Sequence, residues 1–284
     1  MKTSEWLYYN HAAIPTTAPH ETPDLTPISD GSIWSIEGKR PFMARYTTDW
    51  DCGYNTEWWY VIKDSPFDIS TLKTKRRYEI TKALRFFDVK EINPIEYADD
   101  LAHVQEQALS AYPAKYRPVF KRNLFIKSVQ EWSRQIETGS LKAFGAFYKE
   151  NNKLAGYSLV NVNSSFLAFS VQKTIPNFEK YNINAALVNG ILESFKDELS
   201  KGRYICDGTR AINHETHFQD YLEKYFGFRK SYCKLKIVYS HPFKFLVAFL
   251  FPFRRLFAFI DRRIGTCHQV YALLRMEEIA RGCR

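Results

Sequence analysis

The stretch that decides the fold runs from Ala143 to Tyr239, and its first part reads AFGAFYKENNKLAGYSLVNVNSSFLAFSVQKT (residues 143–174). It contains three short apolar and aromatic segments separated by polar, Asn-rich turns, at 143–148, 154–161 and 166–174. Segments of this length between turn residues are typical of β-strands, and the first turn is suited to a hairpin. The sequence therefore predicts three consecutive strands, of which the first two form a hairpin.

The period of the apolar residues changes after the third strand. From Ile183 to Leu199 they recur every three or four residues, as on the buried face of an amphipathic helix. Gly202 ends this helix, residues 203–206 form a brief apolar strand, and a second helix ends near Phe226. Helices that connect strands of one sheet imply right-handed crossovers and parallel pairing. We therefore expect a mixed α/β sheet in which the strand at 203–206 lies parallel to the third strand.

Three short motifs carry a resemblance to a known superfamily. Residues 72–83 (LKTKRRYEITKA) are basic and helical in pattern, residues 206–208 (CDG) end a strand, and residues 222–227 (LEKYFG) hold a lysine and a Phe-Gly pair. Together they resemble the GNAT N-acyltransferases, and within them the branch of Fem-type aminoacyl transferases and BioF2-like acetyltransferases. The resemblance implies acyl transfer and a GNAT-like central mixed sheet flanked by helices, here with a β-rich N-terminal extension and a helical C-terminal tail.

The turn before the helix that begins at Ile183 departs from the family pattern. GNAT enzymes that use acetyl-CoA have a Gly-rich turn there, whose backbone amides hold the pyrophosphate. Here residues 175–182 (IPNFEKYN) contain no glycine and include a carboxylate. Lys173, Asn177 and Lys180 are the candidates for cofactor binding in and beside this turn, but backbone amides approach a phosphate less easily without glycine. The acyl donor, acyl-CoA or aminoacyl-tRNA, therefore stays open.

The third strand is the expected place for the donor. If it diverges from the parallel strand at 203–206, a cleft opens between them. The backbone amides of Ser170, Val171, Gln172 and Lys173 would then be placed to polarise the carbonyl of a thioester or an ester.

Four residues are candidates for proton transfer. Tyr221 and Tyr225 flank Glu223, which occupies the position of the family's usual tyrosine acid, four residues before a Gly-Phe pair. Both tyrosines lie on an apolar helix stripe, so a core role with a satisfied hydroxyl is the alternative interpretation. Asp207 lies where open α/β sheets place ligands, although Asp-Gly also forms turns. His214 can act as a base near neutral pH or stand exposed in the first turn of a helix.

Acidic and aromatic residues alternate at 49–59 (DWDCGYNTEWW). Loops of this composition often bind sugars, so Asp51, Glu57 and Trp58 are candidates for substrate binding. A packed loop of tryptophans is the alternative interpretation.

The composition limits the class of protein. With 284 residues, 45% of them hydrophobic and 16% aromatic, the chain can bury one large core or two small ones. Its five cysteines are scattered, and neither a Cys-x-x-Cys pair nor a His-Glu-x-x-His motif occurs, so we expect no disulfide framework and no metal site. This usage favours a reducing cytoplasm, and residues 1–10 lack the apolar run of an export signal.

The positive charge is concentrated near the C-terminus. The formal net charge is +9, and from Arg229 onward 12 Lys and Arg residues stand against 3 Asp and Glu residues. Residues 245–253 are apolar throughout, and the pairs Arg254-Arg255 and Arg262-Arg263 follow. The apolar run is too short to span a bilayer, and Pro252 interrupts its helical pattern.

Three interpretations of this tail remain open. Residues 243–263 can lie as an interfacial helix on an anionic membrane surface. The tail can instead be a helical hairpin that covers the sheet, with residues 269–279 as its second arm. Basic residues interleaved with aromatics would also suit RNA, which a tRNA-borne donor would require.

The N-terminal third is rich in proline, threonine and aromatic residues. Residues 1–30 are expected to be an extended arm, and strands are expected at 33–36, 41–46, 57–63 and 86–92 around the basic helix. Two helices follow from Pro94, and in GNAT relatives such a pair borders the acceptor cleft. We therefore divide the chain into an arm (1–30), a β-rich part (31–93), an acyltransferase core (94–239) and a basic apolar helical tail (240–284).

The sequence thus predicts a cytoplasmic GNAT-like N-acyltransferase, with acetyl-CoA or another acyl-CoA as co-substrate and no tightly bound cofactor. The expected acceptor is the amine of a sugar or a cell-envelope precursor, and the tail would hold the enzyme at the inner membrane surface as a peripheral protein. One alternative is a Fem-like transferase that takes an aminoacyl group from tRNA. The other is a catalytically silent protein that binds a membrane or a partner.

Overall fold

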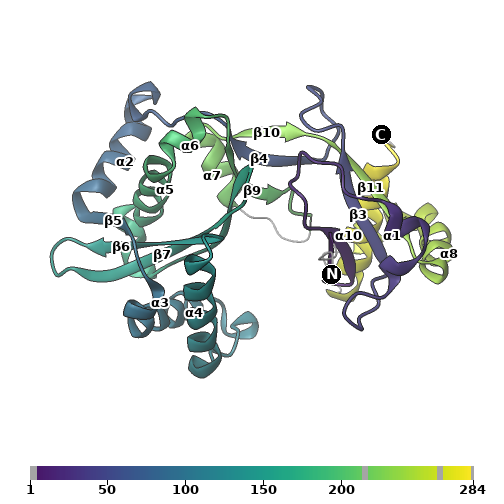
Figure 1. Cartoon of the computed structure of the whole chain (residues 1–284), viewed down its shortest axis with the longest axis horizontal. Coiled ribbons are helices and arrows are strands. Elements are labelled where there is room, and N and C mark those ends of the chain that lie inside the picture. The colour runs from purple at the N-terminus through teal and green to yellow at the C-terminus, as the bar shows by residue number, and fades with distance from the viewer. Residues whose placement is uncertain (1–4, 213–216, 261–264, 283–284) are drawn as a thin grey trace. The chain divides into compact units, whose positions relative to one another are not determined.

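The computed structural model describes residues 5–212, 217–260 and 265–282 (Figure 1). The chain forms two compact units, each assembled from segments that are distant in the sequence. Unit 1 comprises Met1–Val61, Thr209–His217 and Lys230–Arg284, and unit 2 comprises Ile62–Gly208 and Phe218–Arg229. Each unit is thus discontinuous, whereas the sequence was divided into consecutive parts.

The strands form a four-stranded sheet of order β1-β2-β3-β11 and a seven-stranded sheet of order β10-β4-β9-β8-β7-β6-β5. The strands are β1 (Trp6–Tyr9), β2 (Ala12–Pro15), β3 (Met43–Thr48), β4 (Trp59–Lys63), β5 (Phe87–Glu91), β6 (Leu141–Tyr148), β7 (Lys153–Val162), β8 (Phe166–Thr174), β9 (Tyr204–Thr209), β10 (Arg229–Tyr232) and β11 (Lys234–Tyr239). The helices are α1 (Thr26–Ser29), α2 (Thr74–Phe86), α3 (Ala98–Ser110), α4 (Arg122–Glu137), α5 (Ile183–Ser194), α6 (Lys196–Ser200), α7 (His217–Phe226), α8 (His241–Leu250), α9 (Arg254–Ile260) and α10 (Gly265–Ala280).

The sheet of unit 2 has the mixed pairing that the sequence predicts. Strands β5 to β8 are antiparallel neighbours, and β8 pairs with β9 in parallel. β8 has the predicted bounds, because polar turns mark both of its ends. The predicted helix from Ile183 to Leu199 is instead two helices, α5 and α6, which meet at Phe195 (φ −103°, ψ 17°). The buried Phe195 ring contacts Phe144 of β6, with centroids 5.8 Å apart, and this contact fixes the break against the sheet.

Helices cover both faces of this sheet (Figure 1), with α3 and α4 on one face and α2 and α5 on the other. On the α3 and α4 face, Leu101, Val104 and Val129 pack against Leu141 and Leu159. On the other face α5 lies so close to β5 that a Cβ atom at Gly190 would stand 2.5 Å from Val89 Cγ1. The core of unit 2 therefore lies on both faces of its sheet, where the apolar sides of the helices pack.

Unit 1 contains a hairpin where an extended arm was expected. β1 and β2 pair as antiparallel strands, and β2 extends the sheet beside β3. Trp6 is 2% exposed, packs with Ala13 and Ile33, and donates its indole N–H to the backbone oxygen of Asp24 at 2.9 Å. Burial of one large aromatic side chain thus outweighs the turn-rich composition of the segment.

The strand expected at 33–36 is also wrong, because Ser32–Trp34 forms a 3-10 helix. The Asp30 carboxylate accepts a hydrogen bond from the Ser32 backbone amide at 2.9 Å, and this local turn starts the helix.

The tail packs on the sheet of unit 1. Met276 and Ile279 of α10 contact Trp58 and Leu235, and Val247 of α8 contacts Leu274 of α10. This part of the helical-hairpin interpretation is therefore confirmed. Within the described ranges, no helix combines the length and the apolar character that crossing a bilayer requires.

Candidate active site

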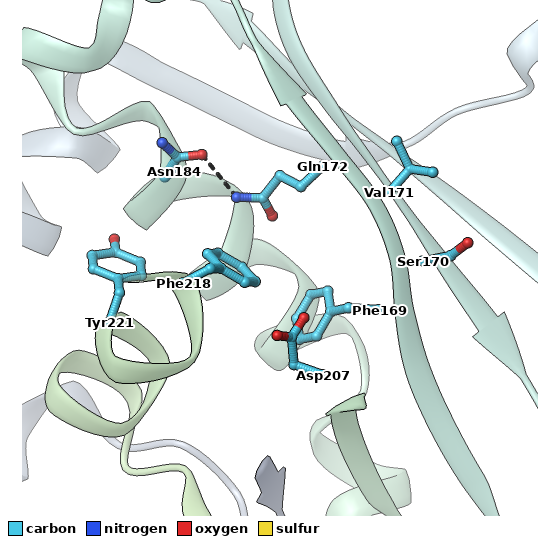
Figure 2. A pocket seen from close by; sticks show the side chains of 8 residues that line it. All are labelled: Phe169, Ser170, Val171, Gln172, Asn184, Asp207, Phe218 and Tyr221. Carbon is cyan, nitrogen blue, oxygen red and sulfur yellow. Dashed lines mark hydrogen bonds between the residues drawn. The ribbon is translucent and has the colours of Figure 1, made fainter. Parts of the chain in front are cut away.

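The parallel strands β8 and β9 pair over three residues at their start. The last opposed residues are Ala168 and Cys206, although the described strands continue to Thr174 and Thr209. The two strands therefore separate beyond Ala168 and Cys206. A cavity of about 400 Å³ lies at this point within unit 2 (Figure 2), lined by Phe169, Ser170, Val171, Gln172, Asn184, Asp207, Phe218 and Tyr221.

A β-bulge lies in β8 at the wall of this cavity. Leu159 of β7 is opposite Val171, whereas Val160 is opposite Phe169, so Ser170 is an extra residue in the ladder. A bulge leaves backbone groups of the extra residue outside the regular hydrogen bonds and bends the strand. In Figure 2 the Ser170 and Val171 side chains point away from Asp207 and Phe218. These two residues therefore contribute mainly backbone to the cavity wall.

Gln172 crosses the cavity wall and contacts α5 (Figure 2). Its Nε2 atom donates to Oδ1 of Asn184 at 2.8 Å. Its Oε1 atom is buried and has no hydrogen-bond partner among the described residues. A buried acceptor without a donor is unfavourable, so this oxygen is a natural partner for an N–H or O–H group of a bound molecule.

Asp207 lies on β9, directly after Cys206, which is the last β9 residue paired with β8. Burial raises the pKa of its carboxyl group to about 7, although a hydrogen bond from Gln219 opposes the shift. The Gln219 side chain also donates to the Asp207 backbone oxygen at 3.2 Å. Gly208 follows with φ +81°, which keeps the turn-forming role of the Asp-Gly pair open. A carboxyl group that titrates near neutral pH in a cavity is suited to accepting a proton.

Tyr221 lines the cavity, whereas Tyr225 does not. Burial raises the pKa of the Tyr221 phenol above its usual range, and the neighbouring Tyr225 and Glu79 raise it further. Tyr225 lies one turn later, with its ring 4.9 Å from that of Tyr221 and its face toward the Arg76 guanidinium at 5.9 Å. Burial and the hydrogen bond with Glu79 raise the pKa of Tyr225 as well. Both phenols are therefore protonated at neutral pH, and Tyr221 is the one beside the cavity.

Two phenylalanines that the sequence analysis does not assign to the site form an aromatic wall. The ring of Phe169 meets that of Phe218 edge-on, with centroids 6.1 Å apart, and Phe218 stacks at 6.1 Å on Tyr221. The apolar periodicity of α7 alone predicts Phe218 in the core. It lies beside a cavity because β8 and β9 separate. Asn184 is the other lining residue without an assigned role, and its position in the first turn of α5 was the signal that could have found it.

In the glycine-free turn before α5, backbone amides donate hydrogen bonds to carbonyl oxygens of the same turn. It forms a 3-10 helix, Pro176–Tyr181, in which Phe178 N–H donates to Ile175 O at 3.0 Å and Asn182 N–H donates to Glu179 O at 2.9 Å. These amides are therefore engaged within the turn, unlike those of a phosphate-binding loop.

The candidate cofactor-binding side chains of this region lie outside the cavity lining. Asn177 and Lys180 are exposed, and the Lys173 ammonium group lies 5.9 Å from the ring centroid of Tyr112.

The predicted sugar-binding residues belong to unit 1 and do not line this cavity. Trp58 is 2% exposed in the core, so its assignment to substrate binding is wrong and the packed-loop alternative applies to it. The Glu57 carboxylate forms an ion pair with Arg275 at 3.0 Å. Asp51 is exposed in a turn with φ +52°.

His214 lies outside the described residues, and His217 is exposed at the start of α7. Within residues 5–212, 217–260 and 265–282, no group of three or more His, Cys, Asp or Glu side chains is arranged to hold a metal ion.

The chain matches no family model and no curated protein sequence. Among solved structures, it is similar to the crystal structure of FemX, with a TM-score of 0.51 and 9% identity over 73% of this chain and 74% of that chain. A tandem GNAT protein from the clavulanic acid biosynthesis pathway overlaps with a TM-score of 0.40 and 11% identity, over 70% of this chain and 65% of that chain. AAC(6')-Iy, solved with a CoA bisubstrate analogue, gives 0.38 and 11%, over 55% of this chain and 97% of that chain.

The sheet order, the divergence of β8 and β9 and the overlap with FemX agree with one another. The chain therefore has a GNAT-like fold, as its motifs predict, and a Fem-type protein is among the structures that share this fold.

Proposed function

We propose that unit 2 transfers an acyl group from a thioester or ester donor to an amine, in the cavity between β8 and β9. The observation that carries this proposal is the end of the strand pairing at Ala168 and Cys206. The bulge at Ser170 and the side chains of Asp207 and Tyr221 lie at the cavity that opens there. An acyl donor that enters between the strands would place its carbonyl group against the backbone of β8. Backbone amides there would stabilise the oxyanion that forms during attack.

The proposed reaction has two proton transfers. The amine nitrogen attacks the carbonyl carbon of the donor, and Asp207 removes the proton that the nitrogen releases. The C–S bond of the tetrahedral intermediate, or the C–O bond of an ester, then breaks. Tyr221 gives its phenolic proton to the leaving sulfur or oxygen. The products are an amide and a free thiol or hydroxyl, and the two side chains recover their protonation states through solvent.

The protonation states of the two groups support these roles. A carboxyl group with a pKa of about 7 is partly ionised near neutral pH. Its ionised form can therefore accept a proton although the group is buried. The raised pKa of the Tyr221 phenol keeps its proton in place until a strongly basic thiolate or alkoxide forms. We therefore assign Asp207 as the general base and Tyr221 as the general acid. We propose Tyr225 only as a neighbour that orients Tyr221.

We propose acyl-CoA as the donor, because the cavity suits the arm that carries its thioester. A pantetheine arm contains two amide groups, and one N–H could satisfy the buried Oε1 atom of Gln172. The aromatic wall of Phe169 and Phe218 would cover the apolar part of the arm. The cavity is large enough for the acyl end of the donor, and Lys173 and Lys180 are candidates for its phosphates.

Aminoacyl-tRNA is the second candidate donor, and two observations favour it. The Phe178 and Asn182 amides of the turn before α5 donate to carbonyl oxygens of the same turn, which weakens the case for a pyrophosphate site. FemX, a Fem-type protein, is among the solved structures whose fold overlaps with this chain, at a TM-score of 0.51. The proposed acceptor in both cases is the amine of a sugar or a cell-envelope precursor.

A thermal-shift titration separates the candidate donors. A ligand that binds only the folded chain stabilises it by about 2.7 kcal/mol when its concentration is 100 times the dissociation constant. We expect acetyl-CoA to raise the melting temperature and aminoacyl-tRNA to leave it unchanged. The opposite result would identify the tRNA-dependent transferase, and no shift with either donor would identify a catalytically silent protein.

The variant Gln172→Ala ties the shift to this cavity. Loss of one hydrogen bond costs about 1 kcal/mol, so we expect roughly fivefold weaker binding of acetyl-CoA. Gln130→Ala is the matched control, because Gln130 is exposed on α4 in the same unit and lines no part of the cavity. Equal shifts for both variants would show that the donor binds elsewhere.

A further inference from the structure

One face of the tail helices is apolar and open to solvent. Its side chains come from α8, the turn after it and α9, and each is about half or more exposed: Phe245 63%, Leu246 48%, Phe249 69%, Phe253 49%, Leu256 53% and Phe259 69%. Single exposed apolar residues are common on proteins, but six large ones within fifteen consecutive positions are unusual and point to an interaction surface. We call these six residues the apolar face.

The apolar face is held in place from behind. Val247 is 2% exposed and Phe251 is 8% exposed, and both pack against Leu274 of α10. The Arg254 guanidinium forms an ion pair with Glu278 of α10 at 2.9 Å. α8 and the turn after it thus pack on α10 through Val247 and Phe251, and Arg254 ties the start of α9 to α10. This packing leaves the other side chains of the two helices outward. The exposure of the phenylalanines is therefore a property of the folded unit.

The charges around the apolar face have one sign. Residues 241–260 contain Lys244, Arg254 and Arg255 and no Asp or Glu. Lys244 and Arg255 are exposed, and neither forms an ion pair with a residue that the structure describes.

The nearby carboxylates of α10 are already engaged. Glu277 contacts Arg281 at 2.7 Å and accepts a hydrogen bond from Tyr239 at 2.8 Å. Glu278 is shared by Arg254 and Arg275. Among the residues that the structure describes, no carboxylate is therefore paired with the exposed Lys244 and Arg255.

We propose that the apolar face docks unit 1 onto an anionic lipid bilayer. Phenylalanine and leucine side chains would enter the boundary between headgroups and acyl chains, while Lys244 and Arg255 would meet lipid phosphates. The helices would lie in the plane of the interface, which agrees with their short lengths of 10 and 7 residues. This proposal does not depend on the acyl-transfer proposal, because every residue that carries it belongs to unit 1.

Charge complementarity favours a lipid surface over other occupants. A second copy of the same face would bring Lys244 and Arg255 toward their own equivalents, and like charges oppose such a contact. RNA binding relies on many cations along a groove, whereas here aliphatic and phenyl groups outnumber the unpaired cations. An anionic bilayer offers both a hydrocarbon layer and a sheet of negative charge.

Flotation of the full chain with lipid vesicles tests the proposal. We expect the protein to float with vesicles of phosphatidylcholine and phosphatidylglycerol in low salt, and much less with phosphatidylcholine alone. Phe249→Ser combined with Phe259→Ser should abolish flotation. Lys244→Glu combined with Arg255→Glu should weaken binding at least about tenfold, because each cation near an anionic surface contributes a several-fold gain. Arg254 is left unchanged, since it is paired with Glu278.

Matched controls keep the test specific. Val119→Ser with Leu124→Ser removes two apolar side chains that are 82% and 56% exposed in unit 2, and this variant should float like the parent. Unchanged melting temperatures would confirm that all variants fold. Absence of flotation by the parent would overturn the proposal. So would a dimer in sedimentation velocity that Phe249→Ser with Phe259→Ser dissociates, or binding of tRNA without binding of vesicles.

Discussion

At the scale of single residues, Asp207 carries the clearest chemical signal, because its pKa of about 7 lies well above the ordinary value of an aspartate carboxyl group. Burial is the cause of this shift, so the carboxyl group is more easily protonated in the folded chain than in the unfolded chain. Between about pH 4 and pH 7 the folded state therefore binds more protons, and the free energy of unfolding falls as the pH rises through this window.

The variant Asp207→Asn tests this shift directly. Asparagine does not titrate, so we expect the parent to lose stability relative to the variant by up to ~4 kcal/mol between about pH 4 and pH 8. Urea unfolding of both proteins at a series of pH values measures the difference. A constant difference across the series would show that folding does not raise the pKa of the Asp207 carboxyl group, and it would remove the match to neutral pH on which its assignment as general base rests.

The sequence predicted part of the site at this scale, for identifiable reasons. Asp207 follows a strand end, and that position alone places it near ligands in an open sheet. Tyr221 and Tyr225 share one helix stripe, and only the path of α7 past the cavity distinguishes them. Trp58 could not be judged from its neighbours in sequence, because its burial depends on Leu235 and Met276, far along the chain.

At the scale of elements, the proposed chemistry depends most on the bulge in β8. Ser170→Pro removes the backbone N–H of the extra residue, whereas Ser170→Ala keeps it. If this amide contacts the donor carbonyl, we expect the proline variant to bind acetyl-CoA roughly fivefold more weakly, at about 1 kcal/mol for one hydrogen bond. The alanine variant should bind like the parent.

Isothermal titration of both Ser170 variants measures the effect. Because Ser170 is exposed and has no partner in β7, both variants should melt near the parent temperature. Equal affinity of the two variants would move the carbonyl contact to another residue. Unfolding of the proline variant would show that the Ser170 amide belongs to the ladder after all.

Elements with local signals were predictable, and elements that depend on distant partners were not. Strands β6 to β8 are bounded by polar turns, so their order follows from the sequence, and so do the limits of β8, whereas β6 and β7 begin before the predicted residues. The hairpin at Trp6–Pro15 was missed because its stability comes from β3 and from the buried Trp6, while its own composition is that of a loop. The bulge itself leaves no pattern in the residue types around Ser170.

At the scale of the whole molecule, the chain alternates between its two units. β3 pairs with β11, so that Met43 lies opposite Tyr239, and the C-terminal helices pack on the sheet that the N-terminal segment begins. No periodicity in one sequence reveals such a pairing. The proposed chemistry resides in unit 2 and the proposed membrane contact in unit 1. Variants in one unit should therefore leave the measurement made on the other unchanged.

Residue-resolved hydrogen exchange is the most direct measurement of whether β8 and β9 separate. In the free protein we expect slow exchange for the paired amides within residues 166–168 and 204–206, and faster exchange for amides of residues 169–172 that point toward β9. Saturating acetyl-CoA should slow exchange of those latter amides. Uniformly slow exchange along β8 in the free protein would show that the strands are joined throughout, and it would contradict the account of an acyl-donor cleft.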